Sequence, residues 1–161
     1  MTFELDEQDL TRRYYSLSRS NHPDNFTMSD SADQLKAIEK TSLINRGYKV
    51  LKNRDLRMKH VLELSGISFE EGKETVSQEF LMEMMDINEL VMEFQFNKKE
   101  SVKLGIFSQL ETLEKSMSLD IKEIISNFDP TKNNIQALNI IKDHFLKRKY
   151  IQRIKDNIQK T

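Results

Sequence analysis

The sequence predicts an all-α protein with an N-terminal helical hairpin followed by a C-terminal three-helix bundle. Only four Gly and two Pro occur in 161 residues, so residues that break helices are rare. Apolar residues recur at spacings of three and four along most of the chain, which is the period of an amphipathic helix. The main turn signals, at Pro23, Gly66 and Asp129-Pro130, separate segments of helical length.

The N-terminal part is predicted to hold three helices, over about residues 7–20, 31–52 and 55–65. Asp6 suits the N-cap of the first, and Leu10, Tyr14 and Leu17 lie on one of its faces. Gly66 is placed to end the third helix as a left-handed residue. These elements predict a first domain over residues 1–66.

The C-terminal part is predicted to hold three long helices, over about residues 77–95, 99–127 and 132–158. Residues 67–76 show no clear apolar period and are interpreted as a linker, so the second domain is expected at 77–161. In the last helix the apolar stripe begins at Leu138 and shifts around the helix before Ile158, and the spacing alone does not explain this shift.

The composition excludes several kinds of chemistry. The chain has no Cys, which excludes disulfides, thiol catalysis and Cys-ligated metals, and its three His are far apart in sequence. No Gly-rich phosphate loop and no nucleophile elbow occurs. We therefore expect no metal, no cofactor and no enzymatic activity. No apolar run reaches the roughly 18 residues of a membrane span, and no secretory leader is visible, so we expect a soluble protein with no membrane partner.

Charge is distributed unevenly along the chain. Residues 61–100 contain ten acidic and three basic side chains, whereas the segments before and after are slightly basic. A basic cluster in the last helix comprises Lys147, Arg148, Lys149, Arg153 and Lys155. Because the sequence pI is about 6.3 and no aromatic platform is interleaved, a solvated helix face is favoured over nucleic-acid binding. The asymmetry indicates two surfaces for two protein partners, although ordinary solvated faces explain it about as well.

The helix predicted at 77–95 is apolar on more than one face. One stripe, expected to be core, comprises Phe80, Met84, Ile87, Val91 and Phe94. A second stripe about 100° around the helix comprises Leu81, Met85, Asn88 and Met92, and Met82, Asp86, Glu89 and Glu93 lie beside it. A helix of a three-helix bundle buries one stripe, so the second is expected to be exposed and to bind a partner. The alternative is that this stripe packs on the first domain.

A His-Pro-Asp tripeptide, residues 22–24, lies between the first two predicted helices. Pro23 stiffens this turn, so that His22 and Asp24 are presented outward beside a basic helix face that carries Arg12 and Arg19. Taken alone, the tripeptide fits an ordinary interhelical turn better than a docking surface.

A longer pattern contains this tripeptide and resembles a J-domain. It comprises Leu10, Tyr14, Leu17, His22, Pro23, Asp24, Phe26, Gln34, Leu35, Ile44, Asn45, Tyr48 and Leu51. The run from Asp55 to Gly66, followed by Phe80-Leu81-Met82-Glu83, resembles one branch in particular, the HscB family of J-type co-chaperones of iron–sulfur cluster assembly. The likeness covers nearly the whole chain.

The resemblance implies a co-chaperone with two protein partners. His22, Pro23 and Asp24 match the tip that stimulates the ATPase of an HscA-type chaperone, and Arg13 and Arg19 match basic positions on the preceding helix. The C-terminal bundle would bind the iron–sulfur scaffold protein IscU and present it to the chaperone. The positions matching the scaffold-binding surface are Leu81, Met82, Met85, Asp86, Glu89, Glu93 and Tyr150.

The chain also departs from the family pattern. The family usually has a further helix of about ten residues before Phe3-Glu4-Leu5-Asp6, and Gly47 stands where Ala is usual. The Cys-rich N-terminal segment of eukaryotic members is absent, so a bacterial cytoplasmic protein is expected. Two alternatives remain, a J-domain protein with another client and a helical adaptor in which His-Pro-Asp is incidental.

Overall fold

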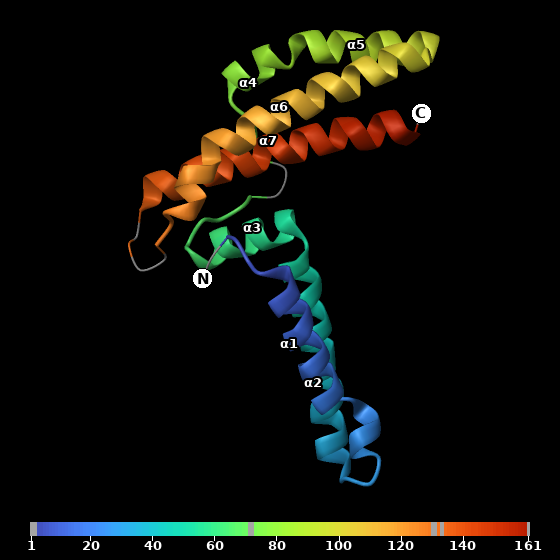
Figure 1. Cartoon of the computed structure of the whole chain (residues 1–161), viewed down its shortest axis with the longest axis vertical. Coiled ribbons are helices and arrows are strands. Elements are labelled where there is room, and N and C mark those ends of the chain that lie inside the picture. The colour runs from blue at the N-terminus through green and yellow to red at the C-terminus, as the bar shows by residue number, and fades with distance from the viewer. Residues whose placement is uncertain (1–2, 71–72, 130–131, 133, 161) are drawn as a thin grey trace. The chain divides into compact units, whose positions relative to one another are not determined.

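A computed structural model describes residues 3–70, 73–129, 132 and 134–160. The chain divides into two compact units, Met1–Val61 and Leu62–Thr161. Every regular element of the described residues is a helix, as the sequence predicts. Figure 1 shows the order of the helices along the chain.

The first unit is built around a helical hairpin. Helices α1 (Glu7–Ser20) and α2 (Ser31–Lys52) lie side by side and are joined through the short 3-10 helix η1 (Pro23–Phe26) (Figure 1). The Asp6 carboxylate caps α1 by accepting the N–H groups of Gln8 and Asp9. The rings of Tyr14 and Tyr48 stack between the two helices at 4.0 Å, so an aromatic pair holds the hairpin together.

Helix α3 (Arg54–Leu64) follows α2 after the single residue Asn53. Arg57, which is buried, donates from Nε to the carbonyl of Phe3 at 3.0 Å and also bonds the carbonyl of Leu51. These bonds connect the start of the described chain to the end of α2. Gly66 has φ of +88°, the left-handed conformation predicted for the residue that ends this helix.

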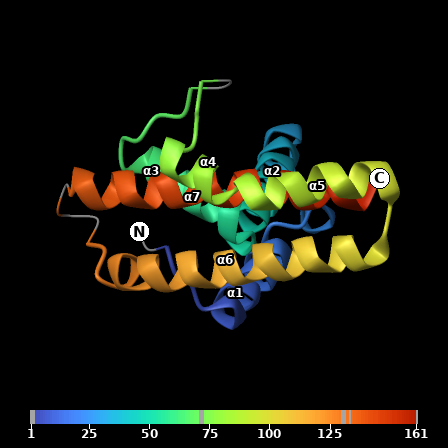
Figure 2. The same ribbon diagram turned by 90° about the horizontal axis from the view of Figure 1, so that it is seen from above.

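The second unit is a bundle of three long helices with a short leading helix. Its elements are α4 (Gln78–Glu83), α5 (Met85–Asn97), α6 (Glu100–Ser126) and α7 (Ile135–Lys160). Figures 1 and 2 show α5, α6 and α7 running alongside one another. The core they share comprises Phe80, Met84, Ile87, Phe94, Ile106, Leu110, Met117, Ile151, Ile154 and Ile158.

The helix expected as one element at 77–95 is divided at Met84. Ser77 caps α4, and α5 begins after the break. The Met84 N–H still bonds the carbonyl of Phe80 at 3.0 Å, and Asn88 bonds back to Met84 at 2.9 Å. The interruption is therefore a bend in an almost continuous helical path, with the Met84 side chain fully buried at its inner side.

The segment between α3 and α4 packs against α7 and is named here the strap, residues 67–70 and 73–76. Phe69 meets Phe145 edge-on at 5.4 Å, and Lys142 reaches Glu74 and the carbonyl of Ser68. The strap lies beside the first half of α7 and α4 and α5 lie beside the second half, whereas α6 runs along both halves. Different neighbours for the two halves explain why the apolar stripe of α7 shifts around the helix.

Candidate partner-binding surfaces

The His-Pro-Asp turn forms the exposed tip of the hairpin. His22 caps η1, because its Nδ1 accepts the Asp24 N–H at 3.3 Å, and Pro23 occupies the first position of that helix. The side chains of His22 and Asp24 are nevertheless 56% and 83% exposed. The turn thus presents an imidazole and a carboxylate to solvent, and the cap bond of His22 helps to fix its backbone.

Side chains on both sides of the tip fix it to the hairpin. The Asn25 amide donates to the carbonyl of Arg19 at 2.8 Å, and the Thr41 hydroxyl donates to the carbonyl of Asn21 at 2.7 Å. Gln34 of α2 donates to two further loop carbonyls. The tip is therefore ordered without being buried, which suits a surface that docks on a partner.

The three arginines assigned to this surface differ in their surroundings. Arg12 and Arg13 both bind the Asp9 carboxylate, Arg13 at 2.6 Å, and their hydrogen bonds lower the pKa of Asp9. Arg19 lies in the last turn of α1, beside the tip, and forms no ion pair with any described residue. Arg19 is therefore the arginine without an ion pair that lies nearest to His22 along the chain, while Arg12 and Arg13 lie about two helical turns before Arg19.

The outer face of α4 and α5 is apolar and exposed. Leu81, Met82 and Met85 are 43%, 69% and 60% exposed, whereas the inner residues Phe80 and Met84 are at most 1% exposed. Asp86, Glu89 and Glu93 are also exposed and continue along the same helix. This is the exposed second stripe with an acidic edge that the sequence predicts, and its role as a binding surface stays a prediction.

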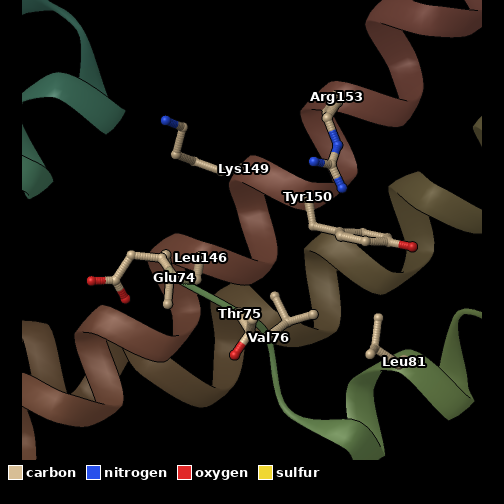
Figure 3. A pocket seen from close by; sticks show the side chains of 8 residues that line it. All are labelled: Glu74, Thr75, Val76, Leu81, Leu146, Lys149, Tyr150 and Arg153. Atoms are coloured by element: carbon tan, nitrogen blue, oxygen red, sulfur yellow. The ribbon is translucent and has the colours of Figure 1, made fainter. Parts of the chain in front are cut away.

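Tyr150 of α7 is half-buried and links α7 to α4 and α5. Its ring meets Phe80 edge-on at 5.7 Å, its hydroxyl accepts the Asn88 amide at 3.3 Å, and the Arg153 guanidinium lies 5.2 Å from the ring centre. Tyr150 and Leu81 line one groove of about 470 Å³ (Figure 3). The structure thus brings these two predicted residues together, although 69 positions separate them in sequence.

Sequence reasoning missed most of the residues that line this groove. They are Glu74, Thr75, Val76, Leu146, Lys149 and Arg153. Leu146, Lys149 and Arg153 lie at helical spacings of three and four from Tyr150, so the sequence places them on the same helix face as that residue. The strap residues gave no such signal, because nothing in their pattern indicates contact with α7.

Within the described ranges, no group of three or more His, Asp or Glu side chains is arranged to hold a metal ion. In the same ranges, no helix combines the length and the apolar character that a membrane span requires. Among the basic cluster, Lys147 pairs with Asp143 of the same helix at 2.8 Å, and Lys155 pairs with Glu114 of α6 at 2.6 Å. The cluster is therefore partly neutralised within the bundle.

Comparison with known proteins gives concordant matches. A family model described as "HSCB C-terminal oligomerisation domain" matches residues 76–159. The chain is 32% identical to the co-chaperone protein HscB of Proteus mirabilis over 145 residues, covering 89% of this chain and 83% of that protein. It is 28% identical to the HscB homolog of Vibrio vulnificus, covering 98% and 88%.

Two solved structures share the fold. Chaperone HscB from Vibrio cholerae superposes with a TM-score of 0.75 at 22% identity, over 99% of this chain and 90% of that one. Human co-chaperone protein HscB superposes with a TM-score of 0.78 at 24% identity, over 98% of this chain and 75% of that one.

Proposed function

Because the chain belongs to the HscB family of co-chaperones, we propose that it stimulates the ATPase of an HscA-type chaperone and delivers an IscU-type scaffold protein to it. Assisting the maturation of iron–sulfur proteins would be the outcome. The chain itself would catalyse no reaction, and a cytoplasmic location in a bacterium fits this role. The observation that carries the proposal is the presence of two differently built exposed surfaces, one in each unit.

The tip of the first unit supports the chaperone-directed half of the proposal. His22 and Asp24 are exposed, and Arg19, three residues before His22, is also exposed and forms no ion pair with a described residue. A partner that binds this tip better in its hydrolysis-competent state would be shifted toward that state, which raises its ATPase rate. The tip needs no catalytic group of its own for this effect.

The outer face of α4 and α5 supports the scaffold-directed half. Leu81, Met82 and Met85 offer exposed apolar anchors, and flexible Met side chains adapt well to a partner surface. The acids Asp86 and Glu89 would steer a basic partner surface and set the salt dependence of association. Apolar anchors at the centre and charges at the rim are the usual arrangement of a specific interface.

His22→Gln tests the chaperone-directed half. The His22 side chain makes a 3.3 Å cap bond, lies 3.4 Å from the exposed Asp24 carboxylate and is more than half exposed, so the substitution should leave the unfolding temperature nearly unchanged. We expect it to abolish stimulation in a steady-state ATPase assay with the HscA-type chaperone while preserving scaffold binding in calorimetric titration. Normal stimulation by the variant would contradict the assignment of this tip.

The same two assays separate the alternatives. A wild-type protein that stimulates the ATPase but does not bind the IscU-type scaffold would be a J-domain protein with another client. A wild-type protein that neither stimulates nor binds would be a helical adaptor whose His-Pro-Asp turn has no chaperone role.

A further inference from the structure

The groove beside Tyr150 combines apolar walls with unpaired positive charge. Its walls come from three segments, the strap with Thr75 and Val76, α4 with Leu81, and α7 with Leu146 and Tyr150 (Figure 3). Its volume of about 470 Å³ is ample for one or two side chains of a partner. It continues directly from the outer face of α4, because Leu81 belongs to both.

Arg153 is positioned for binding an anion at one side of the groove. Its guanidinium lies 5.2 Å from the centre of the Tyr150 ring, and Figure 3 shows it beside that ring. Arg153 is exposed and forms no ion pair with a described residue, in contrast to Lys147 and Lys155 of the same helix. A guanidinium held on an aromatic ring keeps its N–H groups free for bidentate contact with a carboxylate.

Lys149 adds positive charge to the groove, farther from Tyr150 than Arg153 is. Its Nζ lies 5.7 Å from the centre of the Phe145 ring, and in Figure 3 the side chain extends away from Tyr150. Lys149 also forms no ion pair with a described residue. The groove is therefore positive along α7, whereas the outer face of α5 is negative along Asp86, Glu89 and Glu93.

We propose that this groove receives an apolar side chain of the scaffold partner, and that Arg153 binds a carboxylate of that partner beside it. The inference rests on the proposed function and adds the chemistry of the partner surface. The part of the scaffold that contacts α7 would carry an apolar residue next to an acidic residue. The part that contacts α5 would carry a basic patch. Opposite charges at the two edges of one apolar centre would fix the orientation in which the scaffold docks.

The strap is part of this site through its attachment to α7. Lys142 binds the Glu74 carboxylate at 3.0 Å and the Ser68 carbonyl at 3.1 Å, which holds Thr75 and Val76 against the groove. Lys142 is therefore a positioning residue. It lies one turn before Leu146 on the same face of α7 and shapes a wall of the groove without lining it.

The test measures scaffold affinity by calorimetric titration for charge reversals on the full-length protein. We expect Arg153→Glu to weaken binding about tenfold or more, and Lys149→Glu to weaken it only a few-fold. Lys122→Glu is the matched control, because it makes the same charge change on the exposed surface of α6 and should leave affinity within about twofold. Arg153→Gln should fall between wild type and Arg153→Glu.

A charge exchange distinguishes direct contact from an effect on the Tyr150 ring. Each surface Asp and Glu of the scaffold is changed to Lys in turn, and each product is titrated against Arg153→Glu. Recovery of most of the lost affinity by one of them would support the inference, since a purely structural role for Arg153 cannot be rescued from the partner.

Two results would overturn the inference in different ways. Wild-type affinity in Arg153→Glu, or a loss that no scaffold variant recovers, would exclude the carboxylate contact and leave the proposed function standing. Failure of the wild-type protein to bind the scaffold at all would overturn the proposed function and this inference together.

Discussion

Glu74 illustrates how one side chain can order a segment that has no regular structure. Its carboxylate accepts the Glu70 N–H at 2.9 Å and binds Lys142 of α7, whose ammonium also lies 5.2 Å from the Phe69 ring. The hydrogen bond from the Glu70 N–H and, to a smaller extent, the interaction with Lys142 hold the pKa of Glu74 below its ordinary value of 4.5. The carboxylate is therefore stabilised in its charged form in the folded state.

A pH-dependent effect of Glu74→Gln follows from this lowered pKa. The folded pKa is below the unfolded one, so the stabilisation is fully present above about pH 4.5 and is lost as the pH falls through the folded pKa. We expect the variant to be less stable than wild type at pH 7, by about 0.5–1 kcal/mol. Thermal unfolding of both proteins from pH 7 to pH 3 should show this gap closing at the acidic end. A gap that does not vary with pH would argue against the ion pair.

The helical glycines offer a second test at the scale of single residues. A Cβ added at Gly47 in α2 or at Gly105 in α6 would meet no atom within 4 Å. Ala at either position should therefore stabilise the protein by about 0.5–1 kcal/mol, because helical Gly costs more backbone entropy than Ala. The control is Gly66→Ala, which should destabilise because its φ of +88° disfavours a side chain. Chemical denaturation of the three variants measures all three effects, and an unstabilised Gly47→Ala would contradict the account of α2.

At the scale of whole elements, the sequence was most informative where one helix face packs on one neighbour. The apolar spacing predicted α1, α2 and α6 closely, because each packs one stripe against a neighbour, although that stripe is fully buried only in α6. It did not predict the bend at Met84 or the shift along α7. The core stripe of Phe80, Met84 and Ile87 continues through the bend, so the spacing gives no sign of it. The shift depends on the neighbours of α7, and one of them, the strap, has no period of its own.

The same limit applies to the candidate surfaces. The exposure of Leu81 and Met85 could be predicted, because α4 and α5 carry more apolar residues than one buried stripe requires. The groove could not, because its walls come from the strap, α4 and α7 and are assembled only by folding. The excess of apolar residues in α4 and α5 predicted the exposed apolar centre of the surface. Its positive edge at Arg153 could not be predicted in this way, because tertiary contacts bring α7 beside α4.

The α4–α5 element provides a paired test of core against surface. Phe80 and Ile87 are at most 5% exposed, so truncating either to Ala should destabilise the bundle by about 2–5 kcal/mol. Leu81→Ala combined with Met85→Ala should cost little stability, because both side chains are substantially exposed. The double variant should instead lose scaffold affinity, since central apolar anchors are each worth about 2 kcal/mol or more.

Thermal unfolding and scaffold titration on the same samples decide between these outcomes. Lost stability with unchanged affinity would mean that Leu81 and Met85 pack within the protein, and the scaffold surface would then have to lie elsewhere.

At the scale of the whole molecule, the two candidate surfaces belong to different compact units of one chain. The tip with His22 lies in the unit that ends at Val61, and Leu81 and Tyr150 lie in the unit that begins at Leu62. No residue is assigned to both surfaces. A protein of this design would act by holding two partners at once, so that the bound scaffold experiences a high effective concentration of chaperone.

Linkage of two surfaces in one chain predicts that a variant lacking one of them will interfere with the wild-type protein. His22→Gln should still bind the scaffold but should not stimulate the chaperone. Added in excess over wild type when the scaffold is limiting, it should sequester scaffold and lower the scaffold-dependent part of the ATPase rate, in proportion to the share of scaffold that it occupies. The control combines His22→Gln with Leu81→Ala and Met85→Ala, which should remove the interference because that protein no longer sequesters the scaffold. Interference by both variants, or by neither, would show that the two surfaces do not act through separate partners.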